Sequence, residues 1–307
     1  MRSWVRDQWR ATYERLLTRE ISGSPTHVAV IQDGNRRYAR KQGDAAPDGH
    51  RAGARTTEQV LEWCQELGVE ELTLYAFSTE NFERPEEELE PLFDLMAQKL
   101  RDFSDHEQIH ENEVAIRVIG DAEMLPERVR EAVEKAEKRT SEYDQFVLNV
   151  ALAYGGRNEL LTAARDVAQS VADGDVDPAD VDVPTIEREL YGQQVRDVDL
   201  IIRTGGDERT SNFLPWHANG NEAAVFFCAP YWPEFSKVDF LRAIRTYENR
   251  EQSWRRTRAR RALALVKAFG TTELAEATAV VRQFRGSLSG DERDEASRVT
   301  EDPSPAD

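Results

Sequence analysis

Cysteine is nearly absent from this sequence, whose 307 residues include only Cys64 and Cys228. Two widely separated cysteines in hydrophobic surroundings supply neither a disulfide framework nor a zinc site, so we expect both to be packing residues. No apolar run reaches the roughly 20 residues that a transmembrane helix requires, and residues 1–22 are too charged for a secretory signal. These absences predict a cytoplasmic protein.

Lysine is also scarce, because only six of the 40 basic residues are lysines, against 58 acidic residues. The formal net charge of -18 would repel nucleic acid and anionic lipid at long range. We therefore expect no nucleic-acid partner, and any anionic ligand needs a local basic site. A surface that is rich in acids and poor in lysine suits concentrated salt, which screens charge repulsion, so we hypothesise a salt-loving source.

This hypothesis predicts that molar salt stabilises the fold, because screening weakens the repulsion among the excess carboxylates. The midpoint of thermal unfolding, followed by circular dichroism, should rise between low and molar potassium chloride. Folding that is independent of salt over this range would remove the support for the hypothesis.

Six short apolar segments rich in β-branched and aromatic residues predict strands at residues 27–32, 71–77, 114–120, 146–152, 198–203 and 223–228. Helical patterns separate most of them, at residues 52–66, 87–110, 126–142, 159–171 and 238–269. Continuous hydrophobicity within the strands indicates parallel strands that are covered on both faces. The sequence therefore predicts an α/β fold with a central parallel six-stranded sheet flanked by helices.

The sequence Asp-Gly-Asn-Arg-Arg at residues 33–37 directly follows the first predicted strand. Backbone N–H groups, a carboxylate and two arginines converge there, as a diphosphate with Mg²⁺ requires. Asp33 could hold the metal through its oxygens, and Arg36 and Arg37 could bind phosphate. An ordinary Asp-Gly turn with surface arginines explains these residues equally well.

Two further segments follow predicted strands and have a similar character. Residues 203–211 combine Arg203 and Arg209 with glycines and Ser211, and residues 78–85 (STENFERP) add hydrogen-bonding side chains, an aromatic ring and an arginine. The carboxyl ends of parallel strands meet at one edge of a sheet, so the three segments should face one cleft. The glycine motifs of nicotinamide enzymes and P-loop NTPases are absent.

Seven sequence blocks carry a resemblance that covers about residues 25–250. They are HVAVIQDGNRRYARKQG, GHRAGA, LTLYAFSTENFERP, RVIGD, LNVALAYGGRNEL, DLIIRTGGDERTSNFLPW and YWPEF. In this order they resemble the cis-prenyltransferases of the undecaprenyl diphosphate synthase family. The resemblance implies a homodimeric enzyme that adds isopentenyl diphosphate repeatedly to an allylic diphosphate, with Mg²⁺ assisting departure of diphosphate and each new double bond cis.

The resemblance also implies roles for individual residues. Asp33 corresponds to the essential aspartate, and Asp33 and Glu222 are the predicted metal ligands. Asn81 occupies a second catalytic position, where we expect it to orient substrates, because a neutral amide is a poor base. The predicted substrate-binding residues are Gly34, Asn35, Arg36, Arg37, Tyr38, His50, Ser78, Thr79, Glu80, Phe82, Arg84, Arg203, Arg209, Thr210 and Ser211.

A growing hydrophobic product needs a tunnel, and apolar residues of the strands and of the helix at residues 89–103 could line it. The candidates are Val28, Val30, Leu72, Leu74, Ala76, Leu92, Phe93, Leu95, Met96, Leu148 and Val150, although most could equally be ordinary core. A product of about undecaprenyl length, made from a geranylgeranyl or farnesyl starter and serving as a glycosyl carrier lipid, is expected from the resemblance.

The chain departs from the family pattern at several positions. Ala46 stands where many relatives have an arginine, Asp207 replaces a glutamate, and Glu208 replaces a histidine. An arginine-aromatic-glycine element that reaches the partner subunit is not recognisable, and Arg255 or Arg256 could substitute for it. A noncatalytic subunit of the same fold, which stabilises an active synthase, is therefore kept as an alternative to the enzyme.

The ends of the chain differ from its middle. We divide it into an amphipathic helix at residues 1–24, a catalytic domain at 25–255, a helical extension at 256–286 and a disordered acidic tail at 287–307. An arginine-rich segment at residues 250–261, with the apolar residues that follow it, predicts an amphipathic helix that could touch a membrane transiently to release lipid product. Peripheral membrane contact is thus an alternative to a purely cytoplasmic location.

Overall fold

The computed structural model describes residues 13–191, 196–217 and 223–269, together with positions 283, 286, 288 and 293. Contacts divide the chain into two compact units, residues 1–244 and 245–307. The first unit contains the whole sheet and every predicted site residue that the structure describes.

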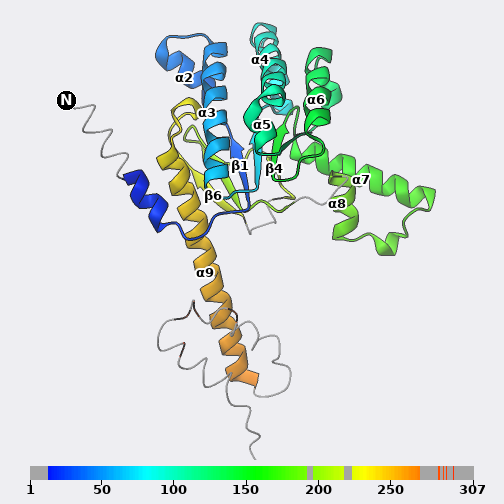
Figure 1. Cartoon of the computed structure of the whole chain (residues 1–307). Coiled ribbons are helices and arrows are strands. Elements are labelled where there is room, and N and C mark those ends of the chain that lie inside the picture. Colours follow the sequence, from blue (N-terminus) through cyan, green and yellow to red (C-terminus); the bar gives the residue numbers. More distant parts are fainter. Residues whose placement is uncertain are drawn as a thin grey trace, which may run out of the picture. The chain divides into compact units, whose positions relative to one another are not determined.

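Six strands form one sheet in which all neighbouring strands are parallel, which confirms the predicted fold class (Figure 1). They are β1 (His27–Ile31), β2 (Glu71–Tyr75), β3 (Val114–Ile119), β4 (Phe146–Ala151), β5 (Leu200–Arg203) and β6 (Ala224–Phe227). The order across the sheet is β3-β4-β2-β1-β5-β6. Because β2 and β5 lie on opposite sides of β1, the chain reverses its direction of winding there, and α/β proteins bind ligands at such a point.

Helices cover the sheet and connect its strands. They are α2 (Asn35–Gln42), α3 (Ala46–Glu66), α4 (Glu86–Asp105), α5 (Glu107–Glu111), α6 (Glu127–Thr140), α7 (Gly156–Asp173), α8 (Val183–Tyr191) and α9 (Lys237–Phe269). Short 3-10 helices include η1 (Thr79–Glu83) and η4 (Trp232–Glu234). The helices α3, α4 and α6 stand in a row, with α4 packed against both α3 and α6 (Figure 1).

The predicted helix at residues 87–110 is two helices, because α4 ends at Asp105 and α5 begins at Glu107. His106 between them has an extended backbone, and its side chain accepts a hydrogen bond from the Gln108 N–H. This contact caps the start of α5, as a short polar side chain does at other helix N-termini. Helix α8 is a further difference, since we predicted no helix there.

The central strands β1 and β5 are buried on both faces, which explains their continuous hydrophobicity. All five residues of β1 are buried, and Ala29 and Ile31 pack in one cluster with Ile201 and Phe213. Residues of β2, β3 and β4 line a cavity that α3 and α4 also enclose. The sheet therefore has one closed face and one face beside a cavity.

The four-part division of the chain stays a prediction. Residues 13–20 are helical within the predicted N-terminal segment, and the predicted acidic tail lies outside the described residues except for positions 288 and 293. None of the helices in the described part of the chain combines the length and hydropathy that crossing a membrane requires. Cys64 and Cys228 are both free thiols, and burial raises the pKa of Cys228 to about 12.

Candidate active site

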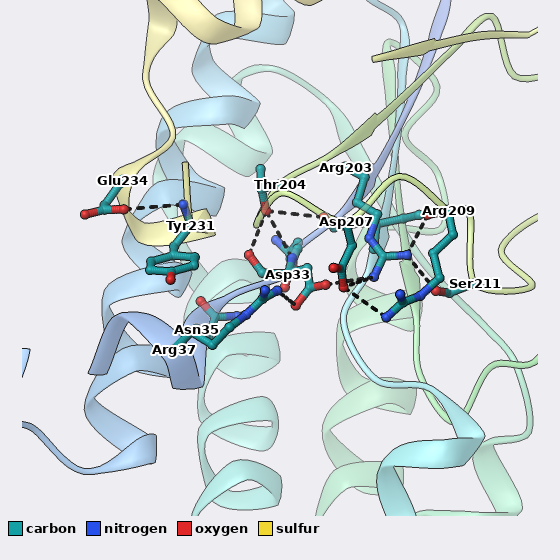
Figure 2. A network of polar contacts seen from close by, with 12 residues as sticks. Asp33, Asn35, Arg37, Arg203, Thr204, Asp207, Arg209, Ser211, Tyr231 and Glu234 are labelled. Carbon is teal, nitrogen blue, oxygen red and sulfur yellow. Dashed lines mark hydrogen bonds and ion pairs between the residues drawn. The ribbon is translucent and has the colours of Figure 1, made fainter. Parts of the chain in front are cut away.

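The carboxylate of Asp33 lies at the centre of the site, two residues beyond the end of β1 (Figure 2). Its Oδ1 accepts a hydrogen bond from Arg37 at 3.0 Å, and its Oδ2 accepts one from Arg203 at 2.8 Å. Arg37 lies four residues after Asp33, in the first turn of α2. Arg203 is the last residue of the neighbouring strand β5 and is paired in register with Ile31. The parallel sheet thus joins two sequence segments that lie 170 positions apart.

The backbone of Asp33 is also fixed in place. Its N–H donates to the hydroxyl of Thr204 at 3.1 Å, and its carbonyl accepts from that hydroxyl at 2.8 Å and from the Trp232 N–H at 3.0 Å. Thr204 is fully buried. The acidic side chain therefore projects from a rigid turn rather than from a loose surface loop, which disfavours the simple surface-turn interpretation.

Two opposing influences act on the pKa of Asp33. Burial raises the pKa of the carboxyl group, but the hydrogen bond from Arg203 and the positive charge of Arg37 together lower it below its ordinary value. Asp33 is consequently ionised at neutral pH. An ionised aspartate that keeps 29% of its side chain exposed can serve as an oxygen ligand to a cation.

Arg203 is almost completely buried, with 3% of its surface exposed. One terminal nitrogen donates to the hydroxyl of Ser211 at 2.6 Å and to the carbonyl of Arg209 at 2.5 Å. The other reaches Asp33 and also lies 3.3 Å from the carboxylate of Asp207. Its Nε is buried without a hydrogen-bond partner, so this guanidinium retains unused donor capacity.

The loop after β5 has an unusual backbone that places these groups close together. Gly205 has φ +88, and a Cβ at this position would lie 2.7 Å from Arg37 and 3.3 Å from the backbone of Asp33. Ser211, with φ 49, also adopts a left-handed conformation that few side chains tolerate. Strain of this kind is typical of binding sites, where the surrounding structure holds it in place.

The N-terminus of α2 adds a site for anions. Gly34 is the N-cap with φ 101, and no side chain caps the free N–H groups of the first turn, which also contains no acidic residue. A Cβ on Gly34 would lie 2.6 Å from the ring of Tyr231. Uncapped N–H groups and the helix dipole attract negative charge, and the arginines Arg36 and Arg37 start from the same turn.

A second group of cations lies beside this helix terminus. Arg36 pairs with Glu88 at 2.9 Å, and the charges of Arg84 and Arg36 both act on His50. The guanidinium of Arg84 has no hydrogen bond or ion pair with another residue in the described part of the chain. Burial and the charge of Arg36 lower the pKa of Arg84, although the group stays a cation. Among the described residues, Glu88 is the only carboxylate that forms an ion pair with a member of this group of Arg36, Arg84 and His50.

His50 should be neutral in the free protein at pH 6. Burial lowers its pKa, and the charges of Arg84 and Arg36 lower it further, to about 4. As the pH falls from the ordinary histidine pKa of about 6.5 towards 4, His50 becomes protonated in the unfolded chain but stays neutral in the folded chain. The residue therefore lowers the free energy of unfolding in that pH range. Nuclear magnetic resonance of labelled histidine should show an unprotonated ring at pH 6 and a higher pKa once pyrophosphate binds. A ring that titrates near 6.5 without ligand would contradict this prediction.

The segment after β2 holds three of the predicted residues in structural contacts. The side chain of Asn81 accepts a hydrogen bond from the Ser78 N–H at 3.2 Å, and the backbone N–H of Asn81 donates to the side chain of Ser78. These two contacts form a capping box at the start of η1. Phe82 packs against Phe77 with ring centroids 4.9 Å apart. In this structure Asn81 orders its own loop, and its role in orienting substrates stays a prediction.

Four other predicted residues form no hydrogen bond or ion pair with Asp33, Arg37 or Arg203 in the described part of the chain. Thr79 lines a separate pocket with Tyr154 and Glu159, on the side of α7. Glu80 is exposed, and the backbone carbonyl of Thr210 accepts the Phe213 N–H at 3.1 Å. Tyr38 is partly exposed on α2. A direct contact of these four residues with a diphosphate stays a prediction.

The residues near Asp33 fit a magnesium ion that is shared with phosphate. Magnesium in proteins commonly binds one or two carboxylates, and phosphate oxygens and water complete its octahedral coordination. Asp33 provides such a carboxylate between two phosphate-type donors, Arg37 and Arg203. Glu222, the second predicted ligand, lies outside the described residues. In the described part of the chain, no cluster of three or more acidic, histidine or cysteine side chains could hold a metal by itself.

A hydrophobic cavity opens from the same site. Gln32, Asn35 and His50 line one part of it, and the buried Oδ1 of Asn35 has no hydrogen-bond partner. Seven of the predicted tunnel residues line the cavity: Leu74, Ala76, Leu92, Leu95, Met96, Leu148 and Val150. The other four, Val28, Val30, Leu72 and Phe93, are buried core and do not line it.

Three residues outside our predictions help to build the site. Thr204 fixes the backbone of Asp33, Trp232 lines the cavity and donates its ring N–H to the Gly53 carbonyl at 2.8 Å, and Tyr231 lies under Arg37 with 5.4 Å from guanidinium to ring centroid. Trp232 and Tyr231 belong to the YWPEF block. The block therefore contained a signal for their role that we did not use.

The departures from the family pattern have mixed outcomes. Asp207 lies in the site, where its carboxylate accepts from Arg209 at 2.9 Å and lies 3.3 Å from Arg203 (Figure 2). The shorter aspartate thus still reaches both arginines. Ala46 is the first residue of α3 and carries no donor, and a missing phosphate contact there stays a prediction.

Comparisons with known proteins agree with these observations. Residues 31–255 match the Prenyltransf family model, which describes undecaprenyl diphosphate synthases. The chain is 68% identical over 288 residues to a tritrans,polycis-undecaprenyl-diphosphate synthase (geranylgeranyl-diphosphate specific) from Halobacterium salinarum, covering 94% of this chain and 95% of the relative. A relative with the same description from Haloarcula marismortui is 64% identical, over 93% of this chain and 94% of its own length.

Solved structures show the same fold. The crystal structure of lavandulyl diphosphate synthase from Lavandula x intermedia, in complex with dimethylallyl diphosphate, superimposes with a TM-score of 0.68 at 30% identity. The match covers 73% of this chain and 95% of that protein. Nearly the whole length of each of these proteins is matched by this chain. The chain therefore belongs to the undecaprenyl diphosphate synthase family of prenyltransferases.

Proposed function

We propose that this enzyme condenses isopentenyl diphosphate repeatedly onto geranylgeranyl diphosphate and forms a tritrans,polycis-undecaprenyl diphosphate. The starter and product are those in the descriptions of the two halobacterial relatives. The observation that supports a diphosphate reaction most directly is the meeting of Asp33, Arg37 and Arg203 beside an uncapped helix N-terminus. The same relatives are described as synthases, so the alternative of a noncatalytic subunit has no specific observation in its favour.

The two diphosphates are assigned to two groups of cations. The allylic diphosphate would occupy the N-terminus of α2, with Arg36, Arg37, Arg84 and neutral His50 as hydrogen-bond donors, and its hydrocarbon would enter the adjoining cavity. The diphosphate of isopentenyl diphosphate would bind at Arg203, Arg209 and Ser211. Arginines offer planar pairs of donors that match phosphate oxygens.

Four of these arginines, all except Arg84, are paired with carboxylates within the protein. Arg203 and Arg209 share Asp207, Arg203 and Arg37 share Asp33, and Arg36 pairs with Glu88. A phosphate carries more charge than a carboxylate and would compete for the same donors, so substrate binding would exchange internal ion pairs for protein–phosphate contacts. This exchange keeps the basic residues ordered before a substrate arrives.

In the reaction, the double bond of isopentenyl diphosphate attacks C1 of the allylic chain while the C1–O bond to diphosphate breaks. The new carbon–carbon bond leaves a cationic centre, and loss of a proton from C2 of the isopentenyl unit forms the new cis double bond. The arginines stabilise negative charge that accumulates on the leaving diphosphate. Magnesium, held by Asp33 and phosphate oxygens, would neutralise the same charge as a Lewis acid.

The departing diphosphate is a better proton acceptor than the protein groups nearby. The pKa of Asp33 is held below its ordinary value, so this carboxylate is a weak base, and the amide of Asn81 is weaker still. The diphosphate leaves with a negative charge close to the carbon that loses the proton. Asp33 is thus assigned to charge stabilisation and Asn81 to the ordering of its loop.

The test is incorporation of radiolabelled isopentenyl diphosphate in high salt with Mg²⁺, with geranyl, farnesyl and geranylgeranyl diphosphate as separate starters. We expect long products, with geranylgeranyl diphosphate giving the highest kcat/KM, and loss of turnover when a chelator removes the metal. A folded protein that incorporates no label with any starter would favour the noncatalytic-subunit alternative. Short products with every starter would contradict the proposed product length.

Two further parts of the proposal concern assembly and location. A homodimer is proposed from the family resemblance, and light scattering of the full chain in molar salt would detect it. Transient membrane contact through the arginine-rich segment at residues 250–261 is proposed for product release, and co-sedimentation with anionic vesicles at low and high salt would detect it. A monomer, or a protein that never sediments with vesicles, would contradict the respective part.

A further inference from the structure

The side chain of Gln32 lines the hydrophobic cavity directly before Asp33 in the chain. Ala29 and Ile31 pack together in a cluster on one face of the sheet. Because side chains alternate along a strand, Gln32 projects to the other face, where it lines the cavity. Gln32 therefore lies at the boundary between the diphosphate site and the space for the hydrocarbon.

The orientation of the Gln32 amide follows from its hydrogen bond with Thr57 on α3. The hydroxyl of Thr57 donates its single hydrogen to the Gly53 carbonyl at 3.2 Å, so it accepts the 2.7 Å hydrogen bond from the amide nitrogen of Gln32. The carbonyl oxygen Oε1 of Gln32 points away from Thr57. It accepts no hydrogen bond from another residue in the described part of the chain.

A second amide oxygen at this part of the cavity also lacks a donor. The amide nitrogen of Asn35 donates to the backbone carbonyl of Gln32 at 3.3 Å, and its Oδ1 is buried without a hydrogen-bond partner. Gly53 leaves room for this oxygen, since a Cβ there would lie 2.3 Å from it. A buried oxygen without a donor costs free energy, and native proteins keep few of them. The two oxygens indicate a ligand that brings positive charge, because the hydrocarbon of a prenyl chain has no hydrogen-bond donor.

The proposed reaction develops positive charge at the same boundary. C1 of the allylic chain is bonded to diphosphate, and the charge spreads over C1 and C3 as the C1–O bond breaks. The negative end of a fixed carbonyl dipole stabilises this charge, and more strongly in a cavity that excludes water than in water itself. An amide oxygen is a weak base and a weak nucleophile, so it neither deprotonates nor traps the cation.

We propose that Gln32 is a catalytic residue of the condensation, and that its amide oxygen, together with that of Asn35, stabilises the positive charge on the allylic carbons. The proposal rests on the proposed function, because it requires an allylic cation beside the diphosphate site. Thr57 is a positioning residue, since it acts by orienting the amide of Gln32. The arginines stabilise the negative charge on the leaving diphosphate, and the amide oxygens stabilise the positive charge that it leaves behind.

Replacing Gln32 by methionine tests this role, because methionine has a similar length but no carbonyl oxygen. With geranylgeranyl diphosphate, Gln32→Met should lower the single-turnover rate of the first addition by about 10-fold, less than the loss of a full oxyanion-hole donor, because two carbons share the charge. KM for both diphosphates should change by less than about twofold, since no phosphate contact is removed. Thr57→Val, which leaves Gln32 in place but removes its acceptor, should lower the same rate by about threefold.

A binding measurement separates charge stabilisation from a change in shape. The charged probe is a quaternary ammonium compound with a geranylgeranyl-length chain, and the uncharged probe has carbon in place of the nitrogen. Both are titrated calorimetrically in the presence of pyrophosphate. The wild-type protein should bind the charged probe more tightly than the uncharged one, and Gln32→Met should reduce this preference by about 10-fold, as for an analogue of the transition state.

The matched control is Gln169→Met. Gln169 is an exposed glutamine of α7 whose amide donates to Asp173 at 3.0 Å, and it does not line the cavity. This variant should react and bind as the wild type does. A wild-type rate in Gln32→Met, or an equal loss of affinity for the charged and uncharged probes, would overturn the catalytic role of Gln32. Failure of the wild-type enzyme to incorporate label with any starter would instead overturn the proposed function.

Discussion

Replacing Asp33 by asparagine should lower kcat for isopentenyl diphosphate incorporation by about 1000-fold, on the scale of losing one charge-stabilising group in an active site. Asparagine has nearly the same shape, and its single carbonyl oxygen can still accept a hydrogen bond from one of the two arginines. The backbone contacts of residue 33 with Thr204 and Trp232 are unchanged, so the fold of the loop should persist. The negative charge that would hold a divalent cation is lost, however. We expect KM for isopentenyl diphosphate to change by less than about threefold, because its arginines remain.

The measurement is steady-state incorporation at several magnesium concentrations, with thermal unfolding recorded in parallel. Asp44→Asn is a suitable control, since Asp44 is an exposed aspartate in the connection between α2 and α3, and its loss should leave kcat unchanged. The half-saturating magnesium concentration should rise in the Asp33 variant and not in the control. Turnover of the Asp33 variant at the wild-type rate would overturn the central role given to this carboxylate.

The sheet could be predicted from the sequence because its central strands are buried on both faces. A run such as HVAVI has no polar residue facing solvent, and burial of all five residues of β1 is the physical reason for that pattern. The meeting of the segments after β1 and β5 also followed from the sequence, since two segments rich in glycine and arginine come directly after these strands. The apolar runs of the strands and the polar residues that follow them are both local features of the sequence, so both could be predicted from it.

Local signals did not reveal which cation would contact which carboxylate. The pairing of Arg203 with Asp33 depends on the register of β1 and β5, in which Arg203 lies beside Ile31. Thr204 was missed for the same reason, because its hydroxyl acts on a residue 171 positions away. Contacts of this kind are set by the fold as a whole.

The division between α4 and α5 shows a second limit of sequence patterns. The apolar spacing continues from Leu100 and Phe103 to Ile109, which is why we predicted one helix. In the structure His106 leaves the helical conformation and caps α5, so the hydrophobic residue Ile109 still reaches the core. The apolar spacing predicted the burial of Ile109 correctly. It could not predict the break between α4 and α5, because the break leaves Ile109 buried.

Replacing Arg203 by lysine should raise KM for isopentenyl diphosphate by about 10- to 100-fold, which corresponds to the loss of one or two charged hydrogen bonds. The guanidinium binds Asp33 through one terminal nitrogen and the Ser211 hydroxyl through the other, and its buried Nε is still unpartnered. Lysine keeps the positive charge but offers a single nitrogen, so it cannot contact a phosphate while holding both neighbours. The effect should therefore appear mainly in KM.

The experiment compares kcat and KM of the variant with those of Arg139→Lys, which alters an ion-paired arginine on α6 remote from Asp33. The control should show wild-type constants. A thermal unfolding midpoint close to that of wild type would show that the variant is folded, and the KM effect would then reflect substrate binding. If Arg203→Lys left both constants unchanged, charge alone would be sufficient at this position. Diphosphate recognition would then depend on a positive charge at the end of β5, and the role given to the planar donor pattern of the guanidinium would be wrong.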